Sequence, residues 1–355
     1  MDSLIVAGSP AGHAARRRVL ATLFRAVAGA ALASALHGCG GGGSGAPEPP
    51  PPAPTPAPSP APSGPIAAQM TVPTPVGYDA ERLAAFNRLN EIRLSAGLGM
   101  VAQSTAMDQA AQAHADWMVA NDVFSHEEQT GTPGFVATDW PLRDEAFGYV
   151  PVGGGEVMSA PAHGAAGVDG LINTVYHRAV MLAFEPVDVG IGWSGAAGAH
   201  VSMPLVIDMT RPGSDSVRGL GQTTQPTIGG IAVWPLDHAS GVPLQLGLEN
   251  PNPVPSRDVL SLGTPMSVTI DRLKTISTMS FVLSESGTGT VIPTRLISNQ
   301  TDPNFLVPPS FVAAVPLVVL NPNTTYNATF SGITTSLEGT LTNVNRTWSF
   351  TTAAH

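Results

Sequence analysis

The chain has 355 residues, of which 43% are hydrophobic and 12% charged, and its formal net charge is −10. A chain of this length can bury at least one hydrophobic core, and its 38 glycines and 34 prolines indicate many turns and a low-complexity segment. Phosphate binding needs a cluster of Lys and Arg, and such a cluster occurs only near the N-terminus, so we expect no nucleic acid partner. The single cysteine, Cys39, excludes both an intrachain disulfide and a thiolate metal cluster.

The first 38 residues have the pattern of an export signal. Three arginines, Arg16 to Arg18, precede an apolar run from Val19 to Leu36, and Cys39 follows shortly after. This order resembles a bacterial lipoprotein signal peptide, in which cleavage leaves a lipidated Cys39 as the new N-terminus. The short span and Arg25 within it argue against a transmembrane helix. We therefore predict a signal peptide over 1–38 and a protein anchored to a membrane of the cell envelope through Cys39, with secretion as the alternative.

A linker follows the signal over residues 39–70. Its "GGGGSGAPEPPPPAPTPAPSPAPSGP" has no helix or strand period and too few large apolar residues to bury. The Gly run is typical of a flexible chain, and the Pro-Ala part is typical of an extended spacer. We expect it to hold a folded module away from the membrane surface.

Helices dominate the first half of a folded domain that we place at residues 78–212. Apolar residues at helical spacing predict helices from 79 to 97, from 104 to 122 and from 168 to 182. The Gly/Pro-rich segment 130–166 is expected to be a loop region, and "VDVGIGW" and "PLVIDM" are expected to be strands. Helices followed by strands indicate an α+β domain.

The remainder of the chain, residues 226–355, has a different pattern. Short alternating stretches such as "GGIAVWPLD", "GTPMSVTI", "TMSFVLSE", "TTYNATFSGI" and "TWSFTT" are separated by Pro, Asn and Gly. This alternation predicts an all-β domain, and we interpret it as an Ig-like β-sandwich.

Three polar residues in the first domain are candidates for chemistry. His126 lies just after Phe124, Glu156 follows three glycines, and His177 lies in the helix predicted over 168–182. Two imidazoles and one carboxylate suit zinc or a similar divalent ion with an open coordination position. Packed or exposed histidines without a shared site are the alternative, because sequence separation alone does not bring the three together.

Helical periodicity places His177 on the polar, small-residue side of its helix, which favours a hydrogen-bonded histidine facing a site over a core histidine. The neighbouring Arg178 is expected to pair with a carboxylate such as Glu156 or Asp188. His114, on the apolar side of its own helix, is expected to be a packing histidine.

These stretches, taken in order, resemble the CAP superfamily of cysteine-rich secretory proteins, antigen 5 and pathogenesis-related protein 1. "FNRLNEIRLSAGLGMVAQSTAMDQAAQAHADWMVANDVFSH", "GGEVMS" and "INTVYHRAVMLAFEPVDVGIGW" resemble the opening motif, the "G-E-N" element and the bacterial "G-H-R…V-G-I-G" motif of that family. The resemblance implies a three-layer α-β-α sandwich with a central cleft lined by His126, Glu156, His177 and Arg178, of which the first three could hold a metal ion. Val157 replaces the Asn of "G-E-N", and no strand reproduces the "H-Y-T-Q" motif, for which His200 is only a loose candidate.

Three functions are compatible with this pattern. We expect a surface-anchored binding module that takes a small amphiphile or a cell-envelope component, with the Ig-like domain as a spacer or adhesive surface. No G-x-S-x-G, H-E-x-x-H or P-loop motif occurs, which favours binding over enzymatic activity. The alternatives are a metal-dependent hydrolase with Glu156 as general base and an envelope protein with a purely structural role.

Overall fold

A computed structural model describes residues 68–212 and 230–355 of the chain. The predicted signal peptide, Cys39 and most of the linker lie outside the described residues. Within these two ranges, none of the helices has the length and apolar character needed to cross a membrane.

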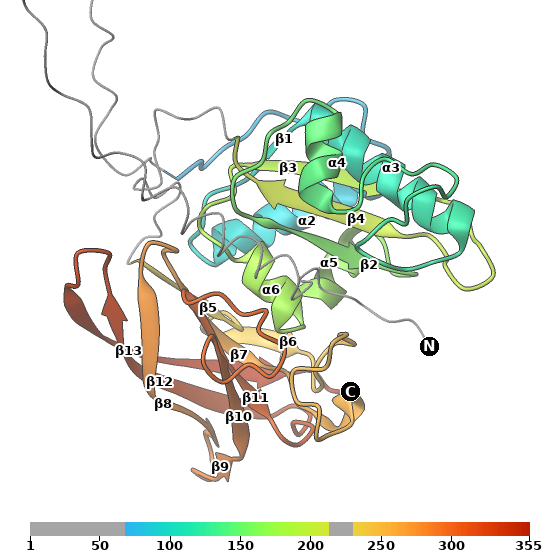
Figure 1. Ribbon diagram of the computed structural model, residues 1–355. Helices are drawn as coiled ribbons and strands as arrows, with labels where there is room; N and C mark the ends of the chain where they lie inside the picture. Colours follow the sequence, from blue (N-terminus) through green and yellow to red (C-terminus); the bar gives the residue numbers. More distant parts are fainter. Residues whose placement is uncertain (1–67, 213–229) are drawn as a thin grey trace, which may run out of the picture. The chain divides into compact units, whose positions relative to one another are not determined.

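The N-terminal part is a four-stranded sheet with helices on both faces (Figure 1). The strands, in the order β1-β3-β4-β2, are β1 (Ala102–Gln103), β3 (Asp188–Trp193), β4 (Leu205–Thr210) and β2 (Gly155–Ser159). Strand β1 runs parallel to β3, and the other pairs are antiparallel. The two predicted strands "VDVGIGW" and "PLVIDM" correspond to β3 and β4.

The helices begin at residues that can cap them. In α2 (Ala80–Ser95) the Asp79 carboxylate accepts a hydrogen bond from Arg82 N, and in α3 (Thr105–Asn121) the Ser104 hydroxyl accepts one from Met107 N. A side-chain acceptor at this position satisfies an amide that has no partner within the helix. Both helices were predicted from apolar periodicity.

Alternation along the strands divides the domain into two cores. Val157, Ile191 and Ile207 point to one face and pack with α2 and α5 (Gly164–Ile172), together with Met181 and Leu182 at the end of α6 (Tyr176–Met181). On the other face, Met158 and Val206 pack with α3. The side chains of Glu156 and Asp208 belong to this second face, because successive strand residues point to opposite sides of a sheet.

Two predictions for this part of the chain are wrong. The segment 130–166 is not only loop, because it holds the short helix α4 (Trp140–Ala146) and strand β2. The helix expected over 168–182 is two helices, α5 and α6, separated by residues 173–175. The break is stabilised by the Glu249 carboxylate, which accepts hydrogen bonds from the amides of Val175 and Tyr176 and so begins a new helix.

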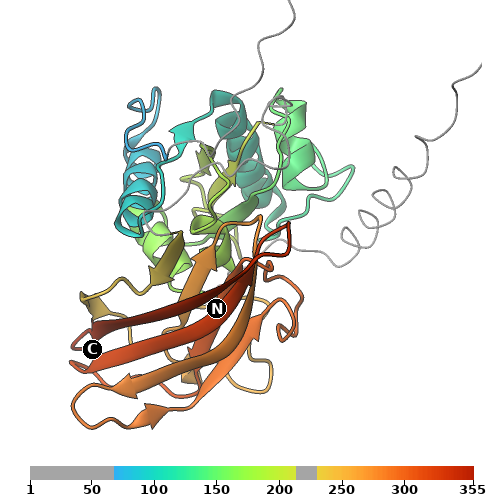
Figure 2. The ribbon, with the colours of Figure 1, turned by 90° about the vertical axis from the view of Figure 1, so that its left-hand side faces the viewer.

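The C-terminal part is built from two sheets (Figures 1 and 2). One sheet has the order β10-β11-β7-β5, formed by β10 (Thr294–Ser298), β11 (Phe311–Pro316), β7 (Met266–Ile270) and β5 (Ile231–Trp234). The other has the order β6-β13-β12-β8-β9, formed by β6 (Ala239–Val242), β13 (Leu341–Thr352), β12 (Thr325–Thr335), β8 (Thr275–Glu285) and β9 (Val291–Ile292). The only helical turn described between these strands is the 3-10 turn Val259–Ser261.

One hydrophobic core joins the two C-terminal sheets. Val268 and Val312 of the first sheet pack in the same cluster as Leu283, Phe330 and Trp348 of the second. The predicted all-β character is therefore confirmed, and the assignment of these sheets to the Ig-like class stays a prediction.

Candidate functional site

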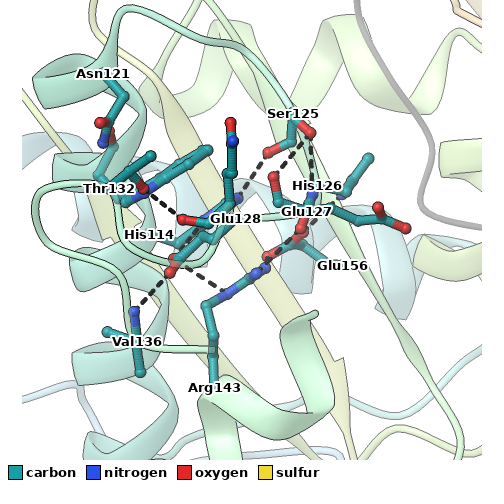
Figure 3. A network of polar contacts seen from close by, with 12 residues as sticks. His114, Asn121, Ser125, His126, Glu127, Glu128, Thr132, Val136, Arg143 and Glu156 are labelled. Carbon is teal, nitrogen blue, oxygen red and sulfur yellow. Dashed lines mark hydrogen bonds and ion pairs between the residues drawn. The ribbon is translucent and has the colours of Figure 1, made fainter. Parts of the chain in front are cut away.

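Two of the predicted site residues, His126 and Glu156, contact each other in the core between α3, α4 and the sheet (Figure 3). The His126 Nδ1 atom lies 2.6 Å from Glu156 Oε1. The other carboxylate oxygen, Oε2, accepts a hydrogen bond of 2.6 Å from Nη2 of Arg143. Arg143 also donates from Nη1 to the backbone carbonyl of His126, at 3.0 Å. Arg143 therefore holds both members of the His126–Glu156 pair.

A second histidine–glutamate pair adjoins the first (Figure 3). His114 Nδ1 lies 2.9 Å from Glu128 Oε1, and its Nε2 lies 2.9 Å from the Ser125 carbonyl oxygen. The Nε atom of Arg143 lies 3.8 Å from the same Glu128 oxygen. His114 is fully buried and stacks on Trp117, as expected for a packing histidine, and it also belongs to the polar network around Arg143.

Two further carboxylates, Asp144 on α4 and Asp208 on β4, are buried beside this network. Both side chains are 0% exposed; the Asp144 oxygens have no hydrogen-bond partner, and the Asp208 carboxyl shares a side-chain hydrogen bond with Glu156 when it is protonated. Glu156 and Asp208 are direct partners in the β2–β4 pairing, so their side chains lie on the same face of the sheet. The network thus places several acidic groups around one guanidinium.

Burial and charge separate the proton affinities of these acids. Burial, followed by the negative charge of Glu156, raises the pKa of Asp144 to about 7 against the pull of Arg143. Burial and the charges of Asp144 and Glu156 raise the pKa of Asp208 well above its usual value. Glu156 behaves in the opposite way: although burial opposes its ionisation, Arg143 and the nearby histidines hold its pKa far below the usual range. Glu156 therefore ionises before Asp144 and Asp208 as the pH rises.

Local sequence explains how Arg143 reaches this position. Asp139 caps α4 through a hydrogen bond from Leu142 N to its carboxylate, and Pro141 lies in the first turn, where a proline fits a helix. The helix packs on α3, which carries His114. Strand β2 brings Glu156 to the same core from the sheet side.

His177 and Arg178 do not belong to this network. Both are 0% exposed and lie on α6, where the neighbouring Val180 lies against Gly155, on the face of β2 opposite to Glu156. His177 Nδ1 lies 2.9 Å from Thr174 Oγ1 and 3.3 Å from Glu249 Oε1. The prediction that His177 shares a site with His126 and Glu156 is therefore wrong.

The predicted partners of Arg178 are also wrong. Its Nε donates to the carbonyl of Ile172 at 2.7 Å, and its Nη1 donates to the carbonyl of Pro265 at 2.6 Å. Burial lowers its pKa to about 9, against the charge of Glu249. Of the carboxylates expected to pair with it, Glu156 binds Arg143 instead, and Asp188 accepts a hydrogen bond from the Tyr149 hydroxyl.

The metal set predicted from sequence does not fit the structure. Among the described residues, no three His, Cys, Asp or Glu side chains are grouped so that they could hold a metal ion. The two oxygens of Glu156 instead face the imidazole of His126 and the guanidinium of Arg143. His200, the loose candidate for a further ligand, is exposed and pairs with Asp122 at 2.6 Å.

Sequence reasoning missed Arg143, Asp144, Glu128 and Asp208. Arg143 and Asp144 lie in the segment expected to be a loop region, although Asp139 followed by Pro141 is a helix-start signal that points to α4. Asp208 could have been noticed as an acidic residue inside the apolar run "PLVIDM". Glu128 follows His126 closely, but nothing in its neighbourhood indicates the long-range pair with His114.

Comparison with known proteins identifies the family of the N-terminal domain. Residues 86–201 match the CAP family, described as the cysteine-rich secretory protein family. This part of the chain is therefore a CAP domain, and its mixed helix and sheet structure agrees with the predicted α+β class. A search among curated proteins gives no match.

Several solved structures are similar to parts of the chain. An extracellular protein containing a SCP domain from Bacillus anthracis is 21% identical with a TM-score of 0.32, and the match covers 37% of this chain and 40% of that one. An outer surface protein from Borrelia burgdorferi is 12% identical with a TM-score of 0.31, over 36% of this chain and 89% of that one. CopC from Methylosinus trichosporium is 12% identical with a TM-score of 0.21, over 35% of this chain and 90% of that one.

Proposed function

We propose that this chain is an exported protein, anchored to the cell envelope through a lipidated Cys39, whose CAP domain binds a small amphiphilic or cell-envelope ligand. The C-terminal two-sheet domain, which we take to be Ig-like, acts as a spacer or adhesive surface. The export and anchoring part of the proposal is supported by the basic residues, apolar run and cysteine of the N-terminal segment.

The observation that favours binding over hydrolysis is the environment of Glu156. A general base must accept a proton near neutral pH and must reach the group that loses it. Glu156 has a strongly lowered pKa, and its two oxygens face Arg143 and His126. This carboxylate is therefore a poor base, and a rigid buried network of this kind is better suited to holding α4, the loop at His126 and the sheet in fixed positions.

The binding proposal is tested by calorimetric titration of the untagged full chain carrying Cys39→Ala, with sodium palmitate and with soluble peptidoglycan fragments as probes. We expect saturable binding of one probe, and weaker binding after His126→Ala because the loop around His126 loses its contact with Glu156. His163→Ala is the matched control, since it removes a partly exposed His–Glu pair (His163 with Glu81, 2.7 Å). If neither probe gives a saturable signal at concentrations up to its solubility limit, the proposed ligand class is wrong.

The anchor is tested by the location of the protein in cells. Cys39→Ala removes the thiol that would carry the lipid, so we expect the protein to move from the membrane fraction to the soluble exported fraction. The measurement is immunoblotting of fractionated cells, with Cys39→Ser as a second variant that lacks the lipid. Continued membrane association of both variants would contradict the lipoprotein assignment.

A further inference from the structure

We infer that the C-terminal two-sheet domain is the obligate internal partner of the CAP domain, and that α6, which carries His177 and Arg178, joins the two into one folding unit. This inference gives the C-terminal domain a role beyond that of a spacer, and it does not depend on which ligand the CAP domain binds. It also assigns a role to the His177–Arg178 motif, which lies outside the network around Glu156.

The C-terminal domain supplies the acceptor at the start of α6. The Glu249 carboxylate accepts hydrogen bonds from the amides of Val175, Tyr176 and His177. These amides come at the start of a helix, where a backbone N–H has no partner within the helix itself. In α2, α3 and α4 the corresponding acceptor is the residue directly before the helix. The start of α6 therefore depends on a residue of another domain.

Side chains of α6 also bind the C-terminal domain. The Tyr176 hydroxyl donates to Asp302 Oδ1 at 2.6 Å and accepts a hydrogen bond of 2.8 Å from Asn304 Nδ2. Arg178 donates from Nη1 to the carbonyl of Pro265. Tyr176, Arg178 and Asp302 are all buried, so water does not compete for these contacts. The polar contacts of α6 thus hold it inside the junction between the two domains.

The apolar cores of the two domains share residues in both directions. Val175, Tyr176 and Ala179 belong to a buried cluster whose other members, such as Phe311, come from the C-terminal domain. In the opposite direction, Ala232 of β5 belongs to the core of the CAP domain that packs on α2 and α5. Burial of apolar surface is the main favourable term in folding. Each core is therefore completed by residues of the other domain.

The break between α5 and α6 is tied to the C-terminal domain as well. Asn173 donates from Nδ2 to the carbonyl of Gln245 at 2.8 Å, and its own carbonyl accepts from Gly247 N at 3.1 Å. The Thr264 hydroxyl donates to Asn173 Oδ1 at 3.3 Å. Because the apolar period continues across residues 173–175, these contacts and Glu249 are what keep the two helices separate.

The first test follows the unfolding of each domain in the intact chain. The parent is the untagged full chain with Cys39→Ala, and hydrogen exchange is measured by mass spectrometry over a urea series, on peptides from α3 and from β12. Hydrogen exchange reports the unfolding of each region separately. We expect both sets of peptides to lose protection at the same urea concentration. Phe281→Leu, in the core between the C-terminal sheets, should shift both sets equally.

The second test measures the association of the two domains after the chain between them is cut. A specific protease site is inserted within residues 213–229 of the same parent, and the full chain is cleaved. Analytical ultracentrifugation over a dilution series gives the dissociation constant of the two halves, with urea added where dissociation is too weak to measure. We expect the halves to remain together at micromolar concentration without urea.

Two matched variants distinguish docking from general stability. Tyr176→Phe removes the hydroxyl that donates to Asp302 across the junction, whereas Tyr78→Phe removes a hydroxyl that donates to Asp108 at 2.7 Å within the CAP domain. A buried hydrogen bond to a carboxylate is strong enough to change an equilibrium constant about tenfold. We therefore expect Tyr176→Phe to raise the dissociation constant of the cleaved halves about tenfold, and Tyr78→Phe to leave it unchanged.

Three results would overturn the inference. The first is a separate transition for the α3 and β12 peptides of the intact chain, and the second is separation of the cleaved halves at micromolar concentration without urea. The third is an equal effect of Tyr176→Phe and Tyr78→Phe on the dissociation constant. If the cleaved halves precipitate, the hydrogen-exchange measurement on the intact chain and on Phe281→Leu decides.

Discussion

Asp208→Asn should raise the melting temperature at about pH 8 and change it little at about pH 4. The Asp208 carboxyl is fully buried, and burial, the charges of Asp144 and Glu156 and a hydrogen bond to Glu156 raise its pKa well above the usual 3.8. Unfolding lets this group ionise in water, so its contribution to stability is complete below about pH 4 and is lost as the pH rises toward the folded-state pKa. An asparagine amide is neutral in both the folded and the unfolded state, so the variant does not lose stability in this way as the pH rises.

The expected gain follows from the proton linkage. Because the folded pKa of Asp208 lies above its unfolded value, the parent loses stability between pH 4 and pH 8 that the variant keeps, so we expect a higher free energy of unfolding for the variant at pH 8. The measurement is urea unfolding across pH 4–8, in which the variant should lose stability with rising pH less steeply than the parent.

Asp169→Asn is the matched control for this prediction. Asp169 pairs with Arg88 at the surface, and its side chain is 50% exposed. Its replacement should produce no comparable change in the pH dependence, because an exposed pair is screened by solvent. If Asp208→Asn lowers stability equally at pH 4 and pH 8, the carboxyl is ionised in the folded protein and the charge balance described for the network is wrong.

The sheet and long helices could be predicted from the sequence because their signals are local. Helical periodicity with Ser104 as a cap defines α3, and the apolar run "PLVIDM" defines β4. The same logic fails at residues 168–182, where the apolar period continues across the break at residues 173–175. The acceptor that begins α6 is Glu249, more than 70 residues away along the chain, and no local pattern can reveal it.

The candidate site was predictable only in part for the same reason. His126 and Glu156 lie in motifs whose order resembles the CAP family, and they are in contact. Arg143 binds the second oxygen of Glu156 and lowers its pKa, yet it lies on a seven-residue helix within a Gly/Pro-rich segment. His177 and Arg178 match a family motif equally well, but strand alternation and the contacts of α6 place them away from Glu156. Motif order therefore indicated the family better than it indicated the ligand set.

Glu249→Ala should lower the free energy of unfolding by about 3 kcal/mol. Oε2 of Glu249 accepts a hydrogen bond from Val175 N at 2.9 Å, and Oε1 accepts from Tyr176 N at 2.6 Å and from His177 N at 3.4 Å. Each buried amide left without an acceptor costs about 1–3 kcal/mol. The same carboxylate is the negative charge that favours the protonated form of the buried Arg178, so its loss also leaves that cation uncompensated.

Two further variants distinguish the loss of these hydrogen bonds from a general loss of packing. Glu249→Gln keeps the shape of the side chain and one acceptor oxygen, but it directs an amide donor at a backbone N–H and removes the charge. We therefore expect its free energy of unfolding to lie between the values of the parent and of Glu249→Ala. Glu285→Ala is the matched control, because Glu285 also accepts two side-chain hydrogen bonds, from Asn321 and Thr288, but at a half-buried position where both hydrogen bonds are exposed. Urea unfolding at neutral pH should show a small change for Glu285→Ala. Equal losses for Glu249→Ala and Glu285→Ala would show that Glu249 does not hold the start of α6, since two surface contacts would then be worth as much as three buried ones.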